Sequence, residues 1–306
     1  MSLLVVGSIA LDSVETPHGK VDDALGGSAV YCSVAASFFH PVQLVGVVGR
    51  DFPDQHVKLL ESHDIDLSGL EVNEGETFRW SGRYSADLNH RDTLSVHLNV
   101  FGNFQPKVPD SYRESRFVFL ANGAPMTQMS VLEQVERPEF VLADTMDLWI
   151  DTARDDLVEL LRRVDGLVLN DEEAKQLTGE SNLIRAGDQI LEMGPKVVMI
   201  KKGEHGSFLF SPRMRFAIPA FPVDDVIDPT GAGDCFAGGL MGYLAGQGRW
   251  TNTELRKAMV YGTVVASCCV QGFSLDALRK TSREELDRRY REFIDFVTVE
   301  PSSTAS

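Results

Sequence analysis

Short runs of almost uninterrupted apolar residues recur up to residue 201, and stretches with helical spacing lie between them. The apolar runs are 3–9, 42–48, 117–121, 140–144, 166–170 and 196–201. The helical stretches are 28–39, 55–63, 152–164 and 183–193. Continuous Val, Leu, Ile and Phe runs are typical of strands that are buried on both faces. The alternation therefore predicts an α/β fold, in which helices cover both faces of a mostly parallel sheet.

Two parts of the chain depart from this rhythm. Residues 77–84 and 93–101 are β-prone and predict a hairpin outside the main sheet, together with residues 13–25. Two ordinary edge strands of the core sheet are the alternative interpretation. After residue 228 the strands stop, and helices are expected in succession at 232–246, 252–270 and 283–296.

Length and composition limit the remaining possibilities. The 306 residues contain no Pro/Gly/Ser linker, so we expect one domain over 1–300 and a flexible tail at 301–306. Four cysteines without a CxxC pair favour a reduced compartment, and a cytoplasmic location is expected. No apolar run approaches the roughly 18 residues of a membrane span, and the first residues lack a signal peptide's basic region. A formal charge of −16 argues against a nucleic acid partner.

The string Asp-Pro-Thr-Gly-Ala-Gly-Asp at 228–234 carries the sharpest chemical signal. Gly231, Ala232 and Gly233 open a helix, where unpaired N–H groups and the helix dipole can form an anion hole. Such a hole stabilises a phosphoryl group during transfer, and Asp234 beside it can accept the proton of an attacking hydroxyl. The alternative is a glycine-rich helix start in which Asp234 is only a first-turn carboxylate.

Two other phosphate-binding motifs are excluded. A dinucleotide fingerprint would require a glycine where Phe236 stands. A Walker A loop requires Ser or Thr after Gly-Lys, but Val21 follows the Gly-Lys pair at 19–20.

Several segments resemble the PfkB/ribokinase family. The string DPTGAGDCFAGGLM at 228–241 is similar to its carboxy-terminal signature, and Gly26-Gly27 with the following SAVYCSVAAS is similar to its amino-terminal motif. Weaker similarities at 44–51, 170–173 and 202–206 follow in the family's order. The resemblance implies a three-layer α/β/α sandwich with a small β lid, formed by 13–25 and 77–101. It also implies ATP-dependent phosphorylation of a hydroxymethyl group with Mg²⁺, and a homodimer formed through the lid.

The resemblance also assigns roles near the signature. Asp234 takes the position of the base, and Gly231 to Gly233 that of the anion hole. Asp228 and Thr230 match positions that help bind a monovalent cation. The loop at 267–272, which would supply the other ligands, is shorter than the ribokinase form, and this argues against K⁺ dependence.

The predicted nucleotide side begins at Asn170 and Glu173, which follow a strand and open a helix. Their spacing fits a capping box. The resemblance implies instead that they position Mg²⁺ and the phosphates, Glu173 through water, and both roles can coexist. The further candidates are Lys201 at a strand end, Gly203 and Gly206 in a glycine turn, and Thr263 beside the adenine.

The predicted acceptor side begins at Asp12, placed at the end of the first strand, where open parallel sheets bind ligands. Its carboxylate can accept two sugar hydroxyls, and Gly26 and Gly27 allow the backbone to approach the ring. Related sugar kinases commonly carry an asparagine shortly after the glycine pair. Tyr31 stands near that place and is the candidate contact here.

The class of acceptor stays open. A sugar is ranked first, a nucleoside second, and a cyclitol is a further candidate. Ring stacking on Phe78, Trp80 or Tyr84 would favour a nucleoside. A phosphosugar would require basic residues, for which Arg79, Arg83 and Arg91 are available. A binding protein of the same fold without turnover is the alternative to any kinase.

Overall fold

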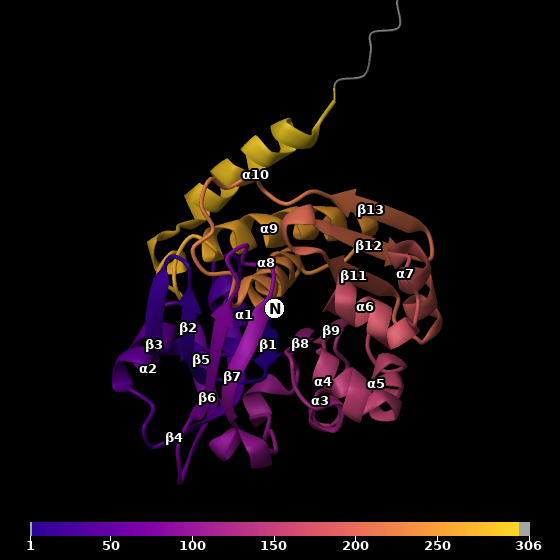
Figure 1. Ribbon diagram of the computed structural model, residues 1–306. Coiled ribbons are helices and arrows are strands. Elements are labelled where there is room, and N and C mark those ends of the chain that lie inside the picture. The colour runs from indigo at the N-terminus through magenta and orange to yellow at the C-terminus, as the bar shows by residue number, and fades with distance from the viewer. Residues whose placement is uncertain (1, 300–306) are drawn as a thin grey trace, which may run out of the picture.

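The computed structural model describes residues 2–299 (Figure 1). The predicted tail at 301–306 lies outside the described residues. Within 2–299, no helix has both the length and the apolar content that crossing a membrane requires.

A nine-stranded sheet forms the middle layer, in the order β13-β12-β11-β10-β9-β8-β1-β4-β5. Its strands are β1 (Leu3–Val6), β4 (Val42–Gly49), β5 (Ile65–Asn73), β8 (Phe117–Leu120), β9 (Phe140–Asp144), β10 (Gly166–Asn170), β11 (Val197–Lys201), β12 (Ser207–Ser211) and β13 (Met214–Ile218). Neighbouring strands are parallel except in the pairs β11–β12 and β12–β13. The predicted mostly parallel sheet is confirmed.

Helices form the two outer layers. They are α1 (Ser28–Ser37), α2 (Asp54–Glu61), α3 (Pro125–Leu132), α4 (Asp147–Thr152), α5 (Arg154–Leu161), α6 (Asp171–Thr178), α7 (Leu183–Glu192), α8 (Ala232–Gln247), α9 (Asn252–Cys269) and α10 (Arg283–Val297). Because side chains alternate along a strand, Leu3 and Val5 enter one core and Leu4 and Val6 the other. Helices α1, α8 and α9 cover the first core, and α3, α5, α6 and α7 cover the second (Figure 1). The three-layer sandwich is confirmed.

A second sheet of four strands, called the lid sheet below, lies at one side of the molecule (Figure 1). Its order is β3-β2-β6-β7, with β2 (Ala10–Thr16), β3 (Gly19–Gly26), β6 (Phe78–Tyr84) and β7 (Arg91–His97). The central pair β2–β6 is parallel, and the two outer pairs are antiparallel. The predicted hairpin therefore lies outside the main sheet, and the alternative of two core edge strands is wrong.

Two predicted strand boundaries are also wrong. The run at 3–9 divides between β1 and the approach to β2, because Ser8 bonds to the start of α1 instead of continuing the strand. The strand expected at 93–101 ends at His97. There Asn99 adopts a φ of 48°, begins a 3₁₀ turn and donates its amide to the carbonyl of Thr77 at 2.9 Å.

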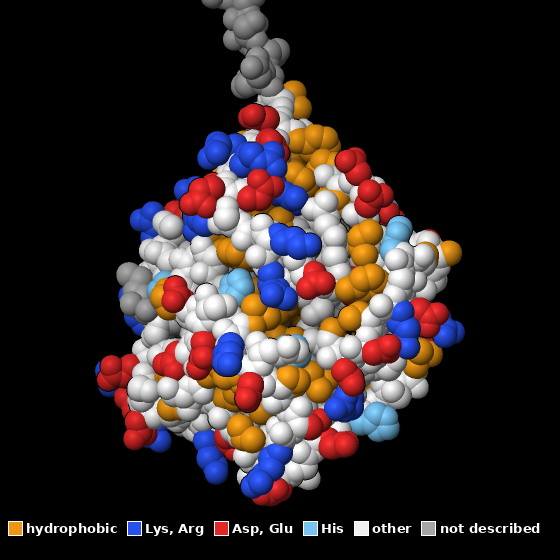
Figure 2. Space-filling model, turned by 90° about the vertical axis from the view of Figure 1, so that its left-hand side faces the viewer, with side chains coloured by type: hydrophobic (Ala, Val, Ile, Leu, Met, Phe, Trp, Pro, Cys, Tyr) orange, Lys and Arg blue, Asp and Glu red, His pale blue; other side chains and the backbone are white. Residues whose placement is uncertain are grey.

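Figure 2 shows the face of the molecule on the side of the lid sheet. Acidic and basic side chains are interspersed over this face. Apolar side chains gather at the top, where α10 ends, and Phe296 there is 63% exposed.

Candidate active site

Neighbouring parallel strands end in polar residues at one edge of the main sheet. Strand β9 ends at Asp144, β10 at Asn170 and β11 at Lys201. The carboxyl ends of parallel strands share one edge, and the ammonium of Lys201 lies 3.6 Å from Oδ2 of Asp144. Burial disfavours the charge on this lysine, but nearby carboxylates, Asp144 first, outweigh burial and raise the pKa of Lys201. Asp144 is absent from the predicted site, although its place at the end of an apolar run was a usable signal.

The capping box at the start of α6 is confirmed. Oδ1 of Asn170 accepts the N–H of Glu173 at 2.8 Å, and Oε2 of Glu173 accepts the N–H of Asn170 at 2.7 Å. Burial raises the pKa of Glu173 to about 7, Lys201 lowers it, and Asp144 raises it. These effects require Glu173 to lie close to the Lys201–Asp144 pair.

The turn before α8 rests on a buried aromatic ring. Gly231 precedes the helix with a φ of 75°, a left-handed conformation that favours glycine. A side chain at Gly231 would lie 2.5 Å from the ring of Tyr31, which is only 2% exposed. The predicted acceptor contact Tyr31 therefore lies beneath the helix start.

The start of α8 lies beside Lys201. Ala232 donates to the carbonyl of Pro229 at 3.2 Å, whereas the N–H of Gly233 has no hydrogen-bond partner among residues 2–299. A side chain at Gly233 would lie 2.9 Å from the ammonium of Lys201. The start of α8 thus has both an unpaired N–H group and a nearby ammonium group.

Asp234 is the third residue of α8, and its side chain is half-buried. The pKa of Asp234 is raised to about 7, by the loss of surrounding water first and by the charge of Asp144 second, although Lys201 and Arg91 lower it. A carboxyl group with this pKa can take up and release a proton near neutral pH.

Asp12 lies within β2 of the lid sheet, and its predicted position at the end of the first strand is wrong. Its carboxylate packs against the glycine pair, because a side chain at Gly26 would lie 1.9 Å from Oδ2 of Asp12. Burial raises the pKa of Asp12 to about 7, the nearby N–H of Gly27 lowers it, and the charge of Asp234 raises it. The lid sheet therefore brings Asp12 within electrostatic reach of Asp234.

Asp228 is buried just before the helix start. Its Oδ1 accepts the N–H of Thr230 at 2.9 Å, and its Oδ2 has no hydrogen-bond partner among the described residues. Burial raises the pKa of Asp228, and the hydrogen bonds from Thr230 lower it. The hydroxyl of Thr230 bonds to that of Tyr84 at 3.2 Å, which joins the lid sheet to the turn.

The predicted adenine contact lies on α9, and the predicted glycine turn follows β11. The hydroxyl of Thr263 donates to a carbonyl within α9 at 2.9 Å. Gly203 and Gly206 bound a 3₁₀ turn after β11, with φ angles of 53° and 82°. In that turn Glu204 accepts a hydrogen bond of 3.5 Å from Asn89 at the tip of the lid hairpin.

A small apolar cavity of about 110 Å³ lies at the carboxyl ends of β1 and β8. Leu98, Phe101 and Trp149 are among the side chains that line it. Gly7 also lines it, and a side chain there would lie 3.2 Å from Oγ of Ser28 at the start of α1. The cavity therefore lies near Ser28, the residue that follows the glycine pair on the predicted acceptor side.

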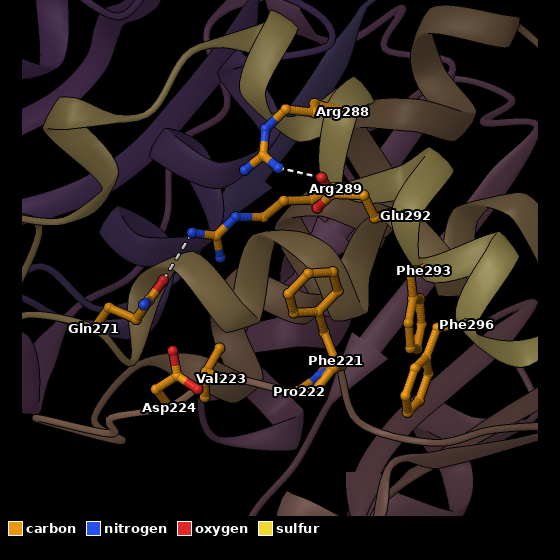
Figure 3. Close-up of a pocket in the computed structure, with 10 residues that line it drawn as sticks. All are labelled: Phe221, Pro222, Val223, Asp224, Gln271, Arg288, Arg289, Glu292, Phe293 and Phe296. Carbon is orange, nitrogen blue, oxygen red and sulfur yellow. Dashed lines mark hydrogen bonds and ion pairs between the residues drawn. The ribbon is translucent and has the colours of Figure 1, made fainter.

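A larger hollow of about 400 Å³ lies between α10 and the segment 221–224, and no predicted site residue lines it (Figure 3). Its two arginines are already engaged. Arg288 pairs with Glu292, and Arg289 donates to Gln271 at 2.8 Å (Figure 3). The predicted base and the predicted anion hole lie at the start of α8 instead.

Comparison with known proteins identifies the family. The family model for pfkB family carbohydrate kinases matches residues 2–281. The chain is 28% identical to a cytidine kinase of Thermococcus kodakarensis, over 81% of this chain and 90% of that protein. It is 33% identical to the aminoimidazole riboside kinase of Salmonella typhimurium, over 83% of this chain and 84% of that protein.

The fold matches a crystal structure of aminoimidazole riboside kinase from Salmonella enterica, solved with aminoimidazole riboside and an ATP analogue. The TM-score is 0.76 at 18% identity, and the match covers 95% of this chain and 100% of that one. The chain therefore belongs to the pfkB family of carbohydrate kinases and is a phosphotransferase that acts on a hydroxyl group.

Proposed function

We propose that this protein transfers the γ-phosphoryl group of ATP to the hydroxymethyl group of a small sugar or sugar-like molecule, with Asp234 as the base. The observation that carries the proposal is the position of Asp234, which directly follows Gly233 and its unpaired N–H group at the start of α8. Its pKa of about 7 suits a group that takes a proton from an alcohol as the oxygen attacks phosphorus. The adjacent N–H groups and Lys201 offer positive potential to the phosphoryl oxygens.

The acceptor binds on the lid side in this proposal. Asp12 accepts hydrogen bonds from two sugar hydroxyls, and the absence of a side chain at Gly26 leaves room for its carboxylate beside the glycine pair. Tyr31 packs under the turn at Gly231 and so supports the anion hole. Its effect on the acceptor is indirect, through the position of that turn.

The nucleotide lies along the edge where β9, β10 and β11 end, with its phosphates toward Lys201 and the turn that Gly203 and Gly206 bound. The residues present fit Mg²⁺, which commonly binds one or two carboxylates, water and substrate phosphates. Glu173 and Asp144 are oxygen donors beside Lys201 that would hold it, directly or through water. When bound, Mg²⁺ neutralises charge on the phosphates. Asn170 fixes Glu173 through the capping box.

A monovalent cation near Asp228 has less support. Its Oδ2 is free, but the carbonyl of Val270 already accepts the N–H groups of Ile227 and Asp228, at 2.7 and 3.2 Å. The carbonyl of Thr230 accepts the thiol of Cys269 at 3.6 Å. Because these neighbouring carbonyls are engaged, we expect turnover without K⁺.

A nucleoside is the second candidate acceptor. The apolar cavity lined by Leu98, Phe101 and Trp149 adjoins the acceptor side and suits a base better than it suits a polar sugar substituent. The similarity to a cytidine kinase points the same way. Stacking on Phe78 is disfavoured, because its ring already stacks on Phe101 at 5.4 Å.

Pairing of lid sheets between two copies would give the expected homodimer. Strand β7 is an edge strand, and Leu94 and Val96 on it are 52% and 50% exposed. An exposed apolar edge strand favours association. The proposed reaction needs only small molecules as partners, and we place it in the cytoplasm.

The first experiment is an ATP-consumption screen of the purified protein with Mg²⁺, with KCl or NaCl, against sugars, nucleosides, cyclitols and phosphosugars. Asp234→Asn is measured in parallel. The variant should lower turnover by about two to four orders of magnitude while ATP still binds, because only the proton acceptor is lost. Near-normal turnover of the variant would refute the role of Asp234. Protein that binds ATP but consumes none with any acceptor would favour a binding protein of this fold.

A further inference from the structure

The lid sheet carries three arginines, and two of them are neutralised within the sheet or beside it. Arg79 pairs with Asp23 and, at 2.9 Å, with Asp51. Arg83 pairs with Glu15 at 3.0 Å. Arg91, in contrast, has no carboxylate within ion-pair distance among residues 2–299. Its charge remains available to a ligand.

Strand pairing directs Arg91 toward the candidate site. Its guanidinium lies over the ring of Trp80, 5.3 Å from the centroid. Trp80 lies directly opposite Asp12 in the β2–β6 pair, and opposite residues share one face of a sheet. Arg91 itself lies opposite Tyr84, whose hydroxyl bonds to Thr230 in the turn before α8. The arginine is therefore on the lid face that carries Asp12, next to the contact between lid and anion hole.

Electrostatics agree with this placement. Burial raises the pKa of both Asp12 and Asp234 to about 7, and the charge of Arg91 lowers both. One guanidinium thus lies within reach of the proposed acceptor carboxylate and of the proposed base. In the proposed reaction the phosphoryl group is transferred beside Asp234, so a guanidinium within reach of Asp234 can also reach the phosphoryl oxygens.

We propose that Arg91 is a catalytic residue, carried by the lid sheet, that binds the phosphoryl oxygens while the group passes from ATP to the acceptor. The inference rests on the proposed function and adds one residue to the same site. In the reaction the acceptor oxygen forms a bond to the γ-phosphorus, and the bond from that phosphorus to the bridging oxygen breaks. The electron pair of that bond leaves with ADP, and the hydroxyl proton goes to Asp234. Arg91 keeps its protons throughout, and its planar donors match two phosphoryl oxygens.

The test compares kcat and KM of the wild type with those of Arg91→Gln and Arg91→Lys, using the acceptor found in the screen. Arginines that contact a phosphoryl group in transfer contribute about a thousandfold or more to kcat. We expect Arg91→Gln to lose about that factor, with much smaller changes in KM for ATP and acceptor and in ADP affinity. Arg91→Lys should retain only part of kcat, because it keeps the positive charge but loses the paired N–H donors of the guanidinium. Arg83→Gln is the matched control, since it removes a lid arginine that pairs with Glu15, and its kcat should equal that of the wild type.

The outcomes are distinguishable. A raised KM for the acceptor with wild-type kcat in Arg91→Gln would mean that Arg91 binds only the acceptor, such as the phosphate of a phosphosugar, and the proposal would be overturned. If Arg91→Gln does not fold, Arg91→Lys decides: a reduced kcat at unchanged KM and melting temperature supports the proposal, and wild-type kcat overturns it. If the wild type phosphorylates no acceptor, the proposed function fails, and this inference fails with it.

Discussion

Asp234 shares its surroundings with charges of both signs, and their balance determines how readily it takes a proton. The loss of water and the charge of Asp144 raise its pKa, and Lys201 and Arg91 lower it, with a result of about 7. Two like charges near each other disfavour ionisation of both, so Asp144 keeps Asp234 basic enough to deprotonate an alcohol. The same arrangement makes the activity sensitive to pH near neutrality.

We expect kcat/KM for the acceptor to fall as the pH drops below about 7, because Asp234 must be ionised to accept a proton. Asp12 titrates over the same range, so the observed midpoint belongs to the pair. Lys201→Met removes a positive charge that lowers the pKa of Asp234. That pKa should rise, and the acid limb of the pH–rate profile should move to higher pH.

Lys202→Met is the control for this shift. The ammonium of Lys202 lies 3.9 Å from the ring centroid of Phe208 and is not among the groups that shift the pKa of Asp234. Its acid limb should coincide with that of the wild type. An acid limb that stays in place in Lys201→Met would contradict the electrostatic role assigned to Lys201.

At the scale of elements, the helix starts of the candidate site and its surroundings are capped in different ways. Side chains cap α6 and α7, through Asn170 and Asn182, and so satisfy N–H groups that a helix start leaves free. Helix α8 begins at Gly231 without a side-chain cap. The N–H of Gly233 remains available to an anion, which is what the proposed phosphoryl site requires.

The two asparagine caps allow the structural and nucleotide roles of Asn170 to be separated. Asn170→Ala and Asn182→Ala should each lower the free energy of unfolding by about 1 kcal/mol, because each loses a cap. Only Asn170→Ala should raise KM for ATP, since only Asn170 fixes Glu173 beside Lys201. Denaturant unfolding and steady-state kinetics measure the two effects. Equal KM values for ATP in both variants would leave Asn170 with a capping role alone.

For the whole molecule, the elements that could be predicted from the sequence are those with a strong local pattern. Strands buried on both faces are continuous apolar runs, so most of the parallel sheet could be located. Strands β12 and β13 were not predicted, because SFLFS and MRFAI mix apolar with polar or charged residues and are short. Strand β5 was also missed, because Asp66, Ser68 and Glu71 interrupt its apolar residues.

The candidate site could be predicted only where its residues form a local motif. The glycine turn and Asp234 lie together in the sequence, as do Asn170 and Glu173. The place of Asp144 in the site and the orientation of Arg91 depend on which strands become neighbours. Strand order cannot be predicted from the local spacing of apolar residues. The misplacement of Asp12 has the same origin, because the bonds of Ser8 to α1 end the first strand early.

The parallel pairing of β2 with β6 has a consequence for the order in which the molecule folds. Strand β3, helix α1, strand β4, helix α2 and strand β5 all lie between these two strands in the chain. Closing so long a loop costs conformational entropy before the contacts of the strand pair can offset it. Strands that are distant in the sequence therefore tend to pair late. During refolding from denaturant, helical circular dichroism should therefore recover before phosphorylation of the acceptor does. A newly made chain would therefore hold its helices before it holds the strand pair that carries Asp12, and its chemistry would begin only afterwards.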